Sequence, residues 1–321
     1  MMTAQIRINE IDKLEILTLQ DNYIEMTTTD NSVVVTRAIP LKDGYFRQSV
    51  LAEHGFSAIV KTGVNGKIRS LLFDFGFSED GAAYNAGILG ADLSSVEAVV
   101  LSHGHNDHTG GFDKLTEMLG KRNIPFIVHP TVFRHPRYLK LPVRDMKILF
   151  SPLEREKIAA SGLKLVESSD PVPLLGNTVL FLGEIPHKTD FEKGFPIAHY
   201  QEDGQEKWDP IEDDTSIVMN LKNKGLVVLS GCAHAGILNT VNYAREVTGI
   251  DKVHAVMGGF HLSGILFEGI IGRTVEELKK INPDYIIPCH CTGRKAIMEF
   301  EKAMPDKFIL NMSGTKMTFT A

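Results

Sequence analysis

The richest concentration of chemically capable side chains in this 321-residue chain is the segment Ser102-His-Gly-His-Asn-Asp-His-Thr-Gly-Gly111. It follows an apolar, strand-like run and precedes a helical pattern. In an extended segment His103 and His105 can point to the same side, and a turn can bring Asp107 and His108 to a neighbouring site. Four polar groups at a strand end are costly to desolvate without partners, so the pattern favours metal binding. Imidazole and carboxylate donors suit zinc, manganese or iron.

This segment resembles the His-x-His-x-Asp-His signature of the metallo-β-lactamase superfamily. The resemblance implies a four-layer αββα sandwich of the mixed α/β (α+β) class, with the metals at one edge. It also implies that His103 and His105 bind a first ion, while Asp107 and His108 bind a second. Two divalent metal ions are therefore the expected cofactors, with zinc preferred and manganese or iron as alternatives.

That resemblance implies one more histidine late in the chain. The segment Pro283-Asp-Tyr-Ile-Ile-Pro-Cys-His290-Cys-Thr-Gly293 supplies it. An apolar strand ends there at His290, which resembles the family's C-terminal metal ligand. Cys289 and Cys291 flank this histidine. If the segment stays extended, both thiols lie on the side opposite to His290 and point away from the metals, so we predict structural roles for them.

A third strand end carries donors in Leu226-Val-Val-Leu-Ser-Gly-Cys232-Ala-His234. In many superfamily hydrolases an aspartate at this place bridges both metals, and here Cys232 occupies or adjoins it. A thiolate can ligate zinc, so Cys232 is a candidate ligand. We expect His234 to complete the first metal site because it ends a strand at the same edge as the other ligands. The alternative is His187, in Gly183-Glu-Ile-Pro-His187.

The wider pattern resembles one subfamily. Together with the segments above, Glu53-His-Gly55 and Gly258-Gly-Phe-His261-Leu262 are similar to the 7,8-dihydropterin-6-yl-methyl-4-(β-D-ribofuranosyl)aminobenzene-5′-phosphate synthase-like proteins. That resemblance implies a small, anionic substrate that bears a pterin or a phosphate and, for the archaeal pathway, a transferase. The stretch Phe73-Asp-Phe-Gly76 departs from the commoner Asp-Thr-Gly at its place, and we assign the Asp74 turn a structural role.

His54 and His261 are candidate catalytic residues outside the ligand count. Each lies in a glycine-flanked turn beside a strand, where a loop can enter an active site. Either could hold an anionic substrate or relay protons while Asp107 acts at the metals; a histidine that is only hydrogen-bonded within its loop is the alternative. For Asn22 and Asn85 a turn role is favoured, with lining or bracing the site as the alternative.

Three functions fit this pattern. Two metal ions can clamp a phosphoryl or carbonyl oxygen and lower the pKa of a bound water, so hydrolysis of a small phosphate- or pterin-bearing substrate is the first prediction. The alternative is a dihydropteroate-synthase-like transfer that joins a hydroxymethyl-dihydropterin pyrophosphate to a ribofuranosylaminobenzene phosphate. The second alternative is a non-catalytic, metal-dependent module for ligand binding or sensing.

The elements that must position these residues are short strands followed by alternating strands and helices. Strands are expected at 14–19, 56–61, 68–74, 98–101, 125–128, 178–182, 216–220, 226–229, 252–257 and 285–288. Helices are expected at 109–119, from an N-cap at Ser151 onward, and at 237–247, 274–280 and 294–303. This order favours packed sheets covered by helices. Segment 187–214 lacks clear periodicity and is predicted to be a lid or insertion.

The composition, 43% apolar and 23% charged, is that of a globular protein, and no linker or low-complexity tract divides it, so one domain over 1–321 is expected. A net charge of −6 without a basic run disfavours nucleic acid as a partner. The chain shows neither an apolar stretch long enough for a membrane span nor a hydrophobic leader, and its three cysteines fit reduced thiols. We therefore expect no membrane contact and a cytoplasmic location; a homo-oligomer stays open.

Overall fold

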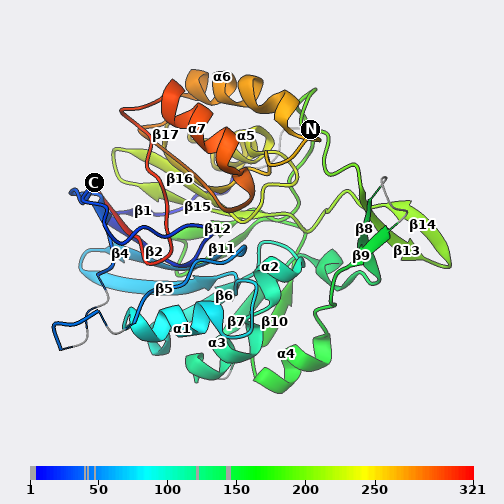
Figure 1. The fold of residues 1–321 in the computed structure, drawn as a ribbon, viewed down its shortest axis with the longest axis horizontal. Helices are drawn as coiled ribbons and strands as arrows, with labels where there is room; N and C mark the ends of the chain where they lie inside the picture. Colours follow the sequence, from blue (N-terminus) through cyan, green and yellow to red (C-terminus); the bar gives the residue numbers. More distant parts are fainter. Residues whose placement is uncertain (1–4, 40, 42, 47, 121–122, 142–145) are drawn as a thin grey trace.

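The computed structural model describes residues 5–39, 41, 43–46, 48–120, 123–141 and 146–321. Two β-sheets pack face to face, and helices cover the outer face of each (Figure 1). The resulting order of layers is helix, sheet, sheet, helix. The four-layer αββα sandwich predicted from the sequence is therefore confirmed.

The first sheet has the strand order β10-β7-β6-β5-β4-β2-β19-β3. Strands β5, β6, β7 and β10 run parallel, so their carboxyl ends lie at one edge of the sheet. The histidine-rich segment follows β6 directly and thus begins at that edge. The strands are β2 (Lys13–Gln20), β3 (Val35–Thr36), β4 (Ser57–Val64), β5 (Lys67–Phe73), β6 (Val96–Val100), β7 (Pro125–Val128), β10 (Lys164–Glu167) and β19 (Lys316–Thr320).

The second sheet has the strand order β11-β12-β15-β16-β17-β18, with β1 beside β15. Strands β16, β17 and β18 are parallel neighbours, so the three loops that follow them also leave the sheet at one edge. The strands are β1 (Glu10–Ile11), β11 (Val172–Leu174), β12 (Val179–Phe181), β15 (Ser216–Leu221), β16 (Gly225–Ser230), β17 (Val253–Gly259) and β18 (Tyr285–Cys289). Because β1 joins this sheet while β19 joins the first, each sheet contains strands from both ends of the chain.

Each sheet buries both of its faces. Leu71 and Phe73 of β5 belong to the core between the sheets, whereas Leu72 packs under the helices on the other side. Successive side chains of a strand point to opposite faces, so a strand buried on both sides has a continuous apolar sequence. The helices are α1 (Gly81–Ile88), α2 (Asn106–Thr109), α3 (Phe112–Leu119) and α4 (Arg155–Ser161) on the first sheet's side, and α5 (Ile237–Thr248), α6 (Ile271–Ile281) and α7 (Arg294–Ala303) on the second's (Figure 1).

One predicted helix start was wrong. We expected Ser151 to cap the helix, but α4 begins at Arg155 with Glu154 as its N-cap. The backbone N–H of Ser151 instead donates to the side-chain oxygen of Asn106, 2.9 Å away. This tertiary contact ties residue 151 to the histidine-rich segment, so the helix starts one turn later.

Segment 187–214 is more regular than its composition suggests. It contains a hairpin of β13 (Ala198–Glu202) and β14 (Gln205–Trp208), which pairs with β8 (Arg137–Leu141) and β9 (Met146–Leu149). These four strands form a small sheet that projects from the sandwich (Figure 1). Asp203 and Gly204 have φ values of 51° and 76°, the left-handed conformations of a tight hairpin turn. Within the described part of the chain, no helix is long and apolar enough to cross a membrane.

Candidate metal centre

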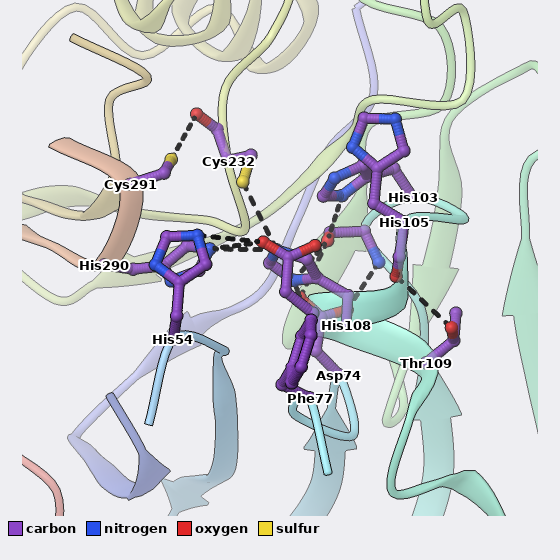
Figure 2. A network of polar contacts seen from close by, with 12 residues as sticks. His54, Asp74, Phe77, His103, His105, His108, Thr109, Cys232, His290 and Cys291 are labelled. Carbon is purple, nitrogen blue, oxygen red and sulfur yellow. Dashed lines mark hydrogen bonds and ion pairs between the residues drawn. The ribbon is translucent and has the colours of Figure 1, made fainter. Parts of the chain in front are cut away.

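The predicted donors meet at one edge of the sandwich. They follow β6, β16 and β18, whose ends the two sheets bring to the same side. Figure 2 shows His54, His108, Cys232 and His290 converging from different parts of the chain. The donors fall into two groups, which differ in chemistry.

The first cluster consists of His103, His105 and His234, whose ligand atoms all lie within 4.8 Å of one another. The Nε2 atoms of His103 and His234 are 3.2 Å apart, and all three side chains are buried. His187 belongs to none of the clusters found among the described residues. The structure therefore places His234, rather than His187, beside the first two histidines.

The second cluster consists of Asp107, His108, Cys232 and His290, again within 4.8 Å. Nε2 of His108 lies 3.3 Å from Sγ of Cys232 and 3.2 Å from Nε2 of His290. A carboxylate oxygen of Asp107 is 3.3 Å from Nε2 of His290. One carboxylate, one thiol and two imidazoles thus face a common point.

Both clusters fit a metal ion better than they fit the protein alone. Nε2 of His105 is buried and has no hydrogen-bond partner in the residues that the structure describes. The other imidazole nitrogens that face inward lie against further nitrogens, a thiol or one carboxylate. The clusters therefore contain more atoms with free lone pairs than there are N–H and S–H groups to hydrogen-bond to them. Imidazole, thiol and carboxylate together suit zinc or iron better than magnesium or calcium.

Polar groups behind the clusters orient several of the rings. Asp74 lies 2.6 Å from Nδ1 of His108, and the hydroxyl of Ser102 lies 3.0 Å from Nδ1 of His103. Asn22 contacts Nδ1 of His290 at 3.3 Å. Such contacts fix the orientation of a ligating histidine and raise its basicity. The predicted structural role of Asp74 was therefore too narrow, because this residue also orients His108. Asn22 contacts His290 at the site, whereas the sequence favoured a turn role for it.

The charges of the two clusters differ. Burial lowers the pKa of His103, His105 and His234, that of His105 to about 3, so the first cluster is neutral. For Asp107, burial would raise the pKa, but His108 and His290 hold it well below its usual range. The second cluster therefore contains a carboxylate anion even without a metal.

The two flanking cysteines behave differently from each other. Cys289 lies in the core between the sheets, as expected. The prediction that Cys291 points away from the site was wrong: its Sγ lies 3.4 Å from the carbonyl oxygen of Cys232 (Figure 2). The segment does not stay extended, because His290 has a φ of 49° and begins a short 3₁₀ turn. Burial and the neighbouring Cys291 raise the pKa of Cys232 well above that of a free thiol.

A cavity of about 600 Å³ opens beside the clusters, and both candidate catalytic histidines line it. His54 is 62% exposed, with its Nε2 at 3.7 Å from Asp107 and its Nδ1 at 3.0 Å from the amide of Asn22. The ring of His261 lies 4.1 Å from that of His234. Asn85, in contrast, binds the backbone of Leu19 and Leu51 and does not reach the site.

Sequence reasoning missed a buried ion pair behind the first cluster. Asp213 accepts a hydrogen bond from the backbone N–H of Gly104 and forms two with Arg137, each 2.8 Å long. Arg137 holds the pKa of this carboxyl well below its usual range despite burial. Asp213 therefore fixes the turn between His103 and His105. The only local sign of this ion pair in the sequence is the pair of adjacent acids, Asp213 and Asp214, that precedes β15.

Comparison with known proteins defines the class. Residues 64–185 match the family model of the metallo-beta-lactamase superfamily. Over 304 residues, 94% of this chain and 95% of the relative, the chain is 31% identical to the 7,8-dihydropterin-6-methyl-4-(beta-D-ribofuranosyl)-aminobenzene-5′-phosphate synthase of Methanocaldococcus jannaschii. The chain belongs to this superfamily and, within it, to the family of that synthase. An uncharacterized protein of the same organism is 26% identical over 82% of this chain and 93% of its own length.

Solved structures agree on the fold. Tm1679, a metal-dependent hydrolase of the beta-lactamase superfamily, has a TM-score of 0.69 at 24% identity and covers 96% of this chain and 100% of its own. The metallo-beta-lactamase fold protein YhfI of Bacillus subtilis has a TM-score of 0.51 at 11% identity, with coverages of 96% and 100%. At these sequence identities the similarity supports the fold alone.

Proposed function

We propose that this protein is a metal-dependent transferase that joins a dihydropterin-methyl pyrophosphate to a ribofuranosylaminobenzene phosphate. The observation that carries the proposal is the 31% identity to the named synthase over 94% of the chain. A second observation supports it: Cys232, which occupies or adjoins the place where many superfamily hydrolases have a bridging aspartate, lies in the second cluster. Hydrolysis of a related phosphate ester, the first choice from the sequence, is the second candidate because the same clusters suit both reactions.

In this proposal the first cluster, His103, His105 and His234, holds one divalent ion. The second cluster, Asp107, His108, Cys232 and His290, holds the other. When bound, the two ions supply charge neutralisation for the pyrophosphate leaving group. Zinc is the preferred ion for both, because imidazole and thiol donors predominate.

The reaction breaks the bond between the pterin methylene carbon and a pyrophosphate oxygen, which takes the electron pair. The amine nitrogen of the second substrate forms the new bond to that carbon and releases its proton to solvent. Of the protein's groups, His54 is placed to hold the leaving group. The amide of Asn22 donates to Nδ1 of His54 and also to the carbonyl of His290, so the ring proton of a neutral His54 is on Nε2. That N–H can donate to an anionic oxygen in the cavity.

The aromatic rings of the two substrates need flat, apolar surfaces. The cavity offers Phe77, Phe150 and Phe195 together with apolar residues of the projecting sheet, Leu139, Ile148 and Leu149. Offset or edge-on contacts with such rings stabilise bound aromatics beyond simple burial. Segment 187–214 is the lid of the site in our proposal, because it contributes Phe195 and is anchored by Glu192, which accepts 2.9 Å hydrogen bonds from Leu238 and Asn239.

The test uses zinc-loaded protein with each substrate alone and with both together. We expect the condensed product, identified by its mass, and pyrophosphate release only when both substrates are present. Release of phosphate or pyrophosphate from one substrate alone would support the hydrolase instead. Metal binding without turnover of either substrate would contradict both candidates and leave the non-catalytic alternative.

A further inference from the structure

Among the described residues, one histidine of the two clusters, His234, has no hydrogen-bond partner for the ring nitrogen that faces away from the cluster. In His103, His108 and His290, Nδ1 contacts a polar group behind the cluster. His234 differs: its Nε2 faces His103 at 3.2 Å, yet its Nδ1 is buried without a partner among the described residues. Ligating histidines normally give their second nitrogen to a carboxylate, a carbonyl or water. The second nitrogen of His234 therefore lacks an explanation within the first cluster.

His261, which lies beside the ring of His234, also lacks hydrogen-bond partners within the described part of the chain. Both ring nitrogens of His261 are buried without a hydrogen-bond partner in the described chain, and its ring lies 4.1 Å from that of His234. The backbone of His261 has a φ of 46°, a conformation that a residue other than glycine adopts only at a cost. Strain at a residue whose polar atoms meet no protein group points to a ligand from outside the protein.

A third donor stands beside these two histidines. The ligand atoms of Cys232, His234 and His261 lie within 4.8 Å of one another, the same limit that defines the first and second clusters. Thiol and imidazole are the donors of structural and catalytic zinc sites. The three residues follow the parallel strands β16 and β17, so the sheet itself keeps them together.

We propose that Cys232, His234 and His261 form a third metal position, selective for zinc and other ions that prefer sulfur and nitrogen. This position goes beyond the proposed function, which requires two ions. Cys232 also belongs to the second cluster and His234 to the first, where its Nε2 faces His103. The third position would therefore use Nδ1 of His234, and occupation of both positions would require this ring to release its N–H proton to solvent. Because two of its three donors are shared, the third position binds more weakly than the other two.

The surroundings give an ion access to this position. His234 and His261 line the cavity of about 600 Å³ that contains the clusters, and they also line a smaller one of about 240 Å³. The smaller cavity is lined by Gly236, the residue that caps α5 at its N-terminus, and by the loops that contain Phe260 and Phe267. The third position thus stands between two cavities.

The experiment counts zinc equivalents on the full chain after treatment with a chelator, by calorimetry and native mass spectrometry. The variant is His261→Asn, because asparagine tolerates a positive φ but lacks the imidazole. The control is His187→Asn, an exposed histidine beside Gly194 that belongs to no cluster of the described chain. We expect wild type and control to bind a third, weaker equivalent, and His261→Asn to keep two and lose the third.

Saturation of the wild type at two equivalents, or an unchanged third equivalent in His261→Asn, would overturn the third position. Binding of fewer than two equivalents by the wild type would instead contradict the dinuclear centre of the proposed function. If His261→Asn fails to fold by circular dichroism, the same zinc count on His261→Gly decides the matter, because glycine adopts a positive φ without strain and also lacks the imidazole. Loss of the third equivalent alone is expected, and a retained third equivalent would count against the proposal.

Discussion

The two donor clusters lie side by side but are built on different principles. The first cluster consists of three buried imidazoles, neutral because burial lowers their pKa values. The second cluster adds the carboxylate of Asp107 and the thiol of Cys232 to two imidazoles. The second also has the shorter supporting contact, a 2.6 Å hydrogen bond in which the carboxylate of Asp74 accepts from Nδ1 of His108.

Because of this difference, the two clusters would bind metal ions in different ways: both supply donor atoms, but only the second also offsets the positive charge of the ion. Neutral nitrogen donors accept many transition metals and leave the charge of the ion uncompensated. Anionic donors offset that charge, and a thiolate narrows the choice toward zinc or iron. We therefore expect changes in the second cluster to affect activity most, and changes in the first to affect how stability responds to acid.

The largest effect is expected from Asp107→Ala. It removes the one carboxylate of the second cluster, so turnover in the proposed transfer reaction should fall to background while the fold persists, because core burial comes from β6 and not from the loop. Turnover and circular dichroism should therefore diverge. Asp113→Ala, an exposed acid in α3, is the control. Parallel loss of structure and activity would make the cluster structural.

Cys232 provides the next test. Cys232→Ser should weaken binding of the second ion by at least about tenfold, or roughly 1.4 kcal/mol, and change the first ion less. Cys232→Asp should restore binding, because a carboxylate again offsets the charge. Cys289→Ser, a change of the thiol in the core between the sheets and outside both clusters, is the control. Two-site zinc titration would show equal affinities in all variants if Cys232 only packs.

A smaller effect is expected behind the second cluster. Asp74→Asn removes the negative charge that faces Nδ1 of His108 and should lower zinc affinity there by about tenfold, the low end of the range for such supporting contacts. The first cluster should respond less, since His103 contacts the hydroxyl of Ser102. The same titration measures both sites. An equal loss at the two sites would show that Asp74 supports the whole edge and not one ring.

The sequence revealed much of this site because its strongest signals are local. The histidine-rich segment contributes four donors within six residues, and strands buried on both faces are readable as continuous apolar runs. Strand β7 and helix α7 have the predicted bounds.

The remaining features depend on contacts distant in the chain or on single backbone angles. Asp213 meets Gly104 across 109 positions, and no local pattern shows that contact. A positive φ at His290 turns Cys291 toward the site, which an extended strand would not allow. The sequence did favour His234 over His187, because His234 ends a strand at the ligand edge, and the structure places it with His103 and His105. The Asp203-Gly204 hairpin, in contrast, was visible in the sequence and could have been predicted.

The smallest effect on activity is expected from the last change, which alters the stability of the metal-free protein in acid. Burial lowers the pKa of His105 to about 3, against about 6.5 when unfolded, so the unfolded chain binds the extra proton between these values. Stability is therefore full above about pH 6.5 and falls as the pH drops toward 3, by up to about 1.4 kcal/mol per pH unit for this ring. His108 opposes this trend, because Asp107 and Asp74 outweigh burial and raise its pKa.

Urea unfolding at pH 5 and 7 should show a smaller pH dependence for His105→Gln than for the wild type. His199→Gln, on β13 outside both clusters, should keep the wild-type dependence. A wild-type dependence in His105→Gln would mean that the acid sensitivity arises outside the first cluster.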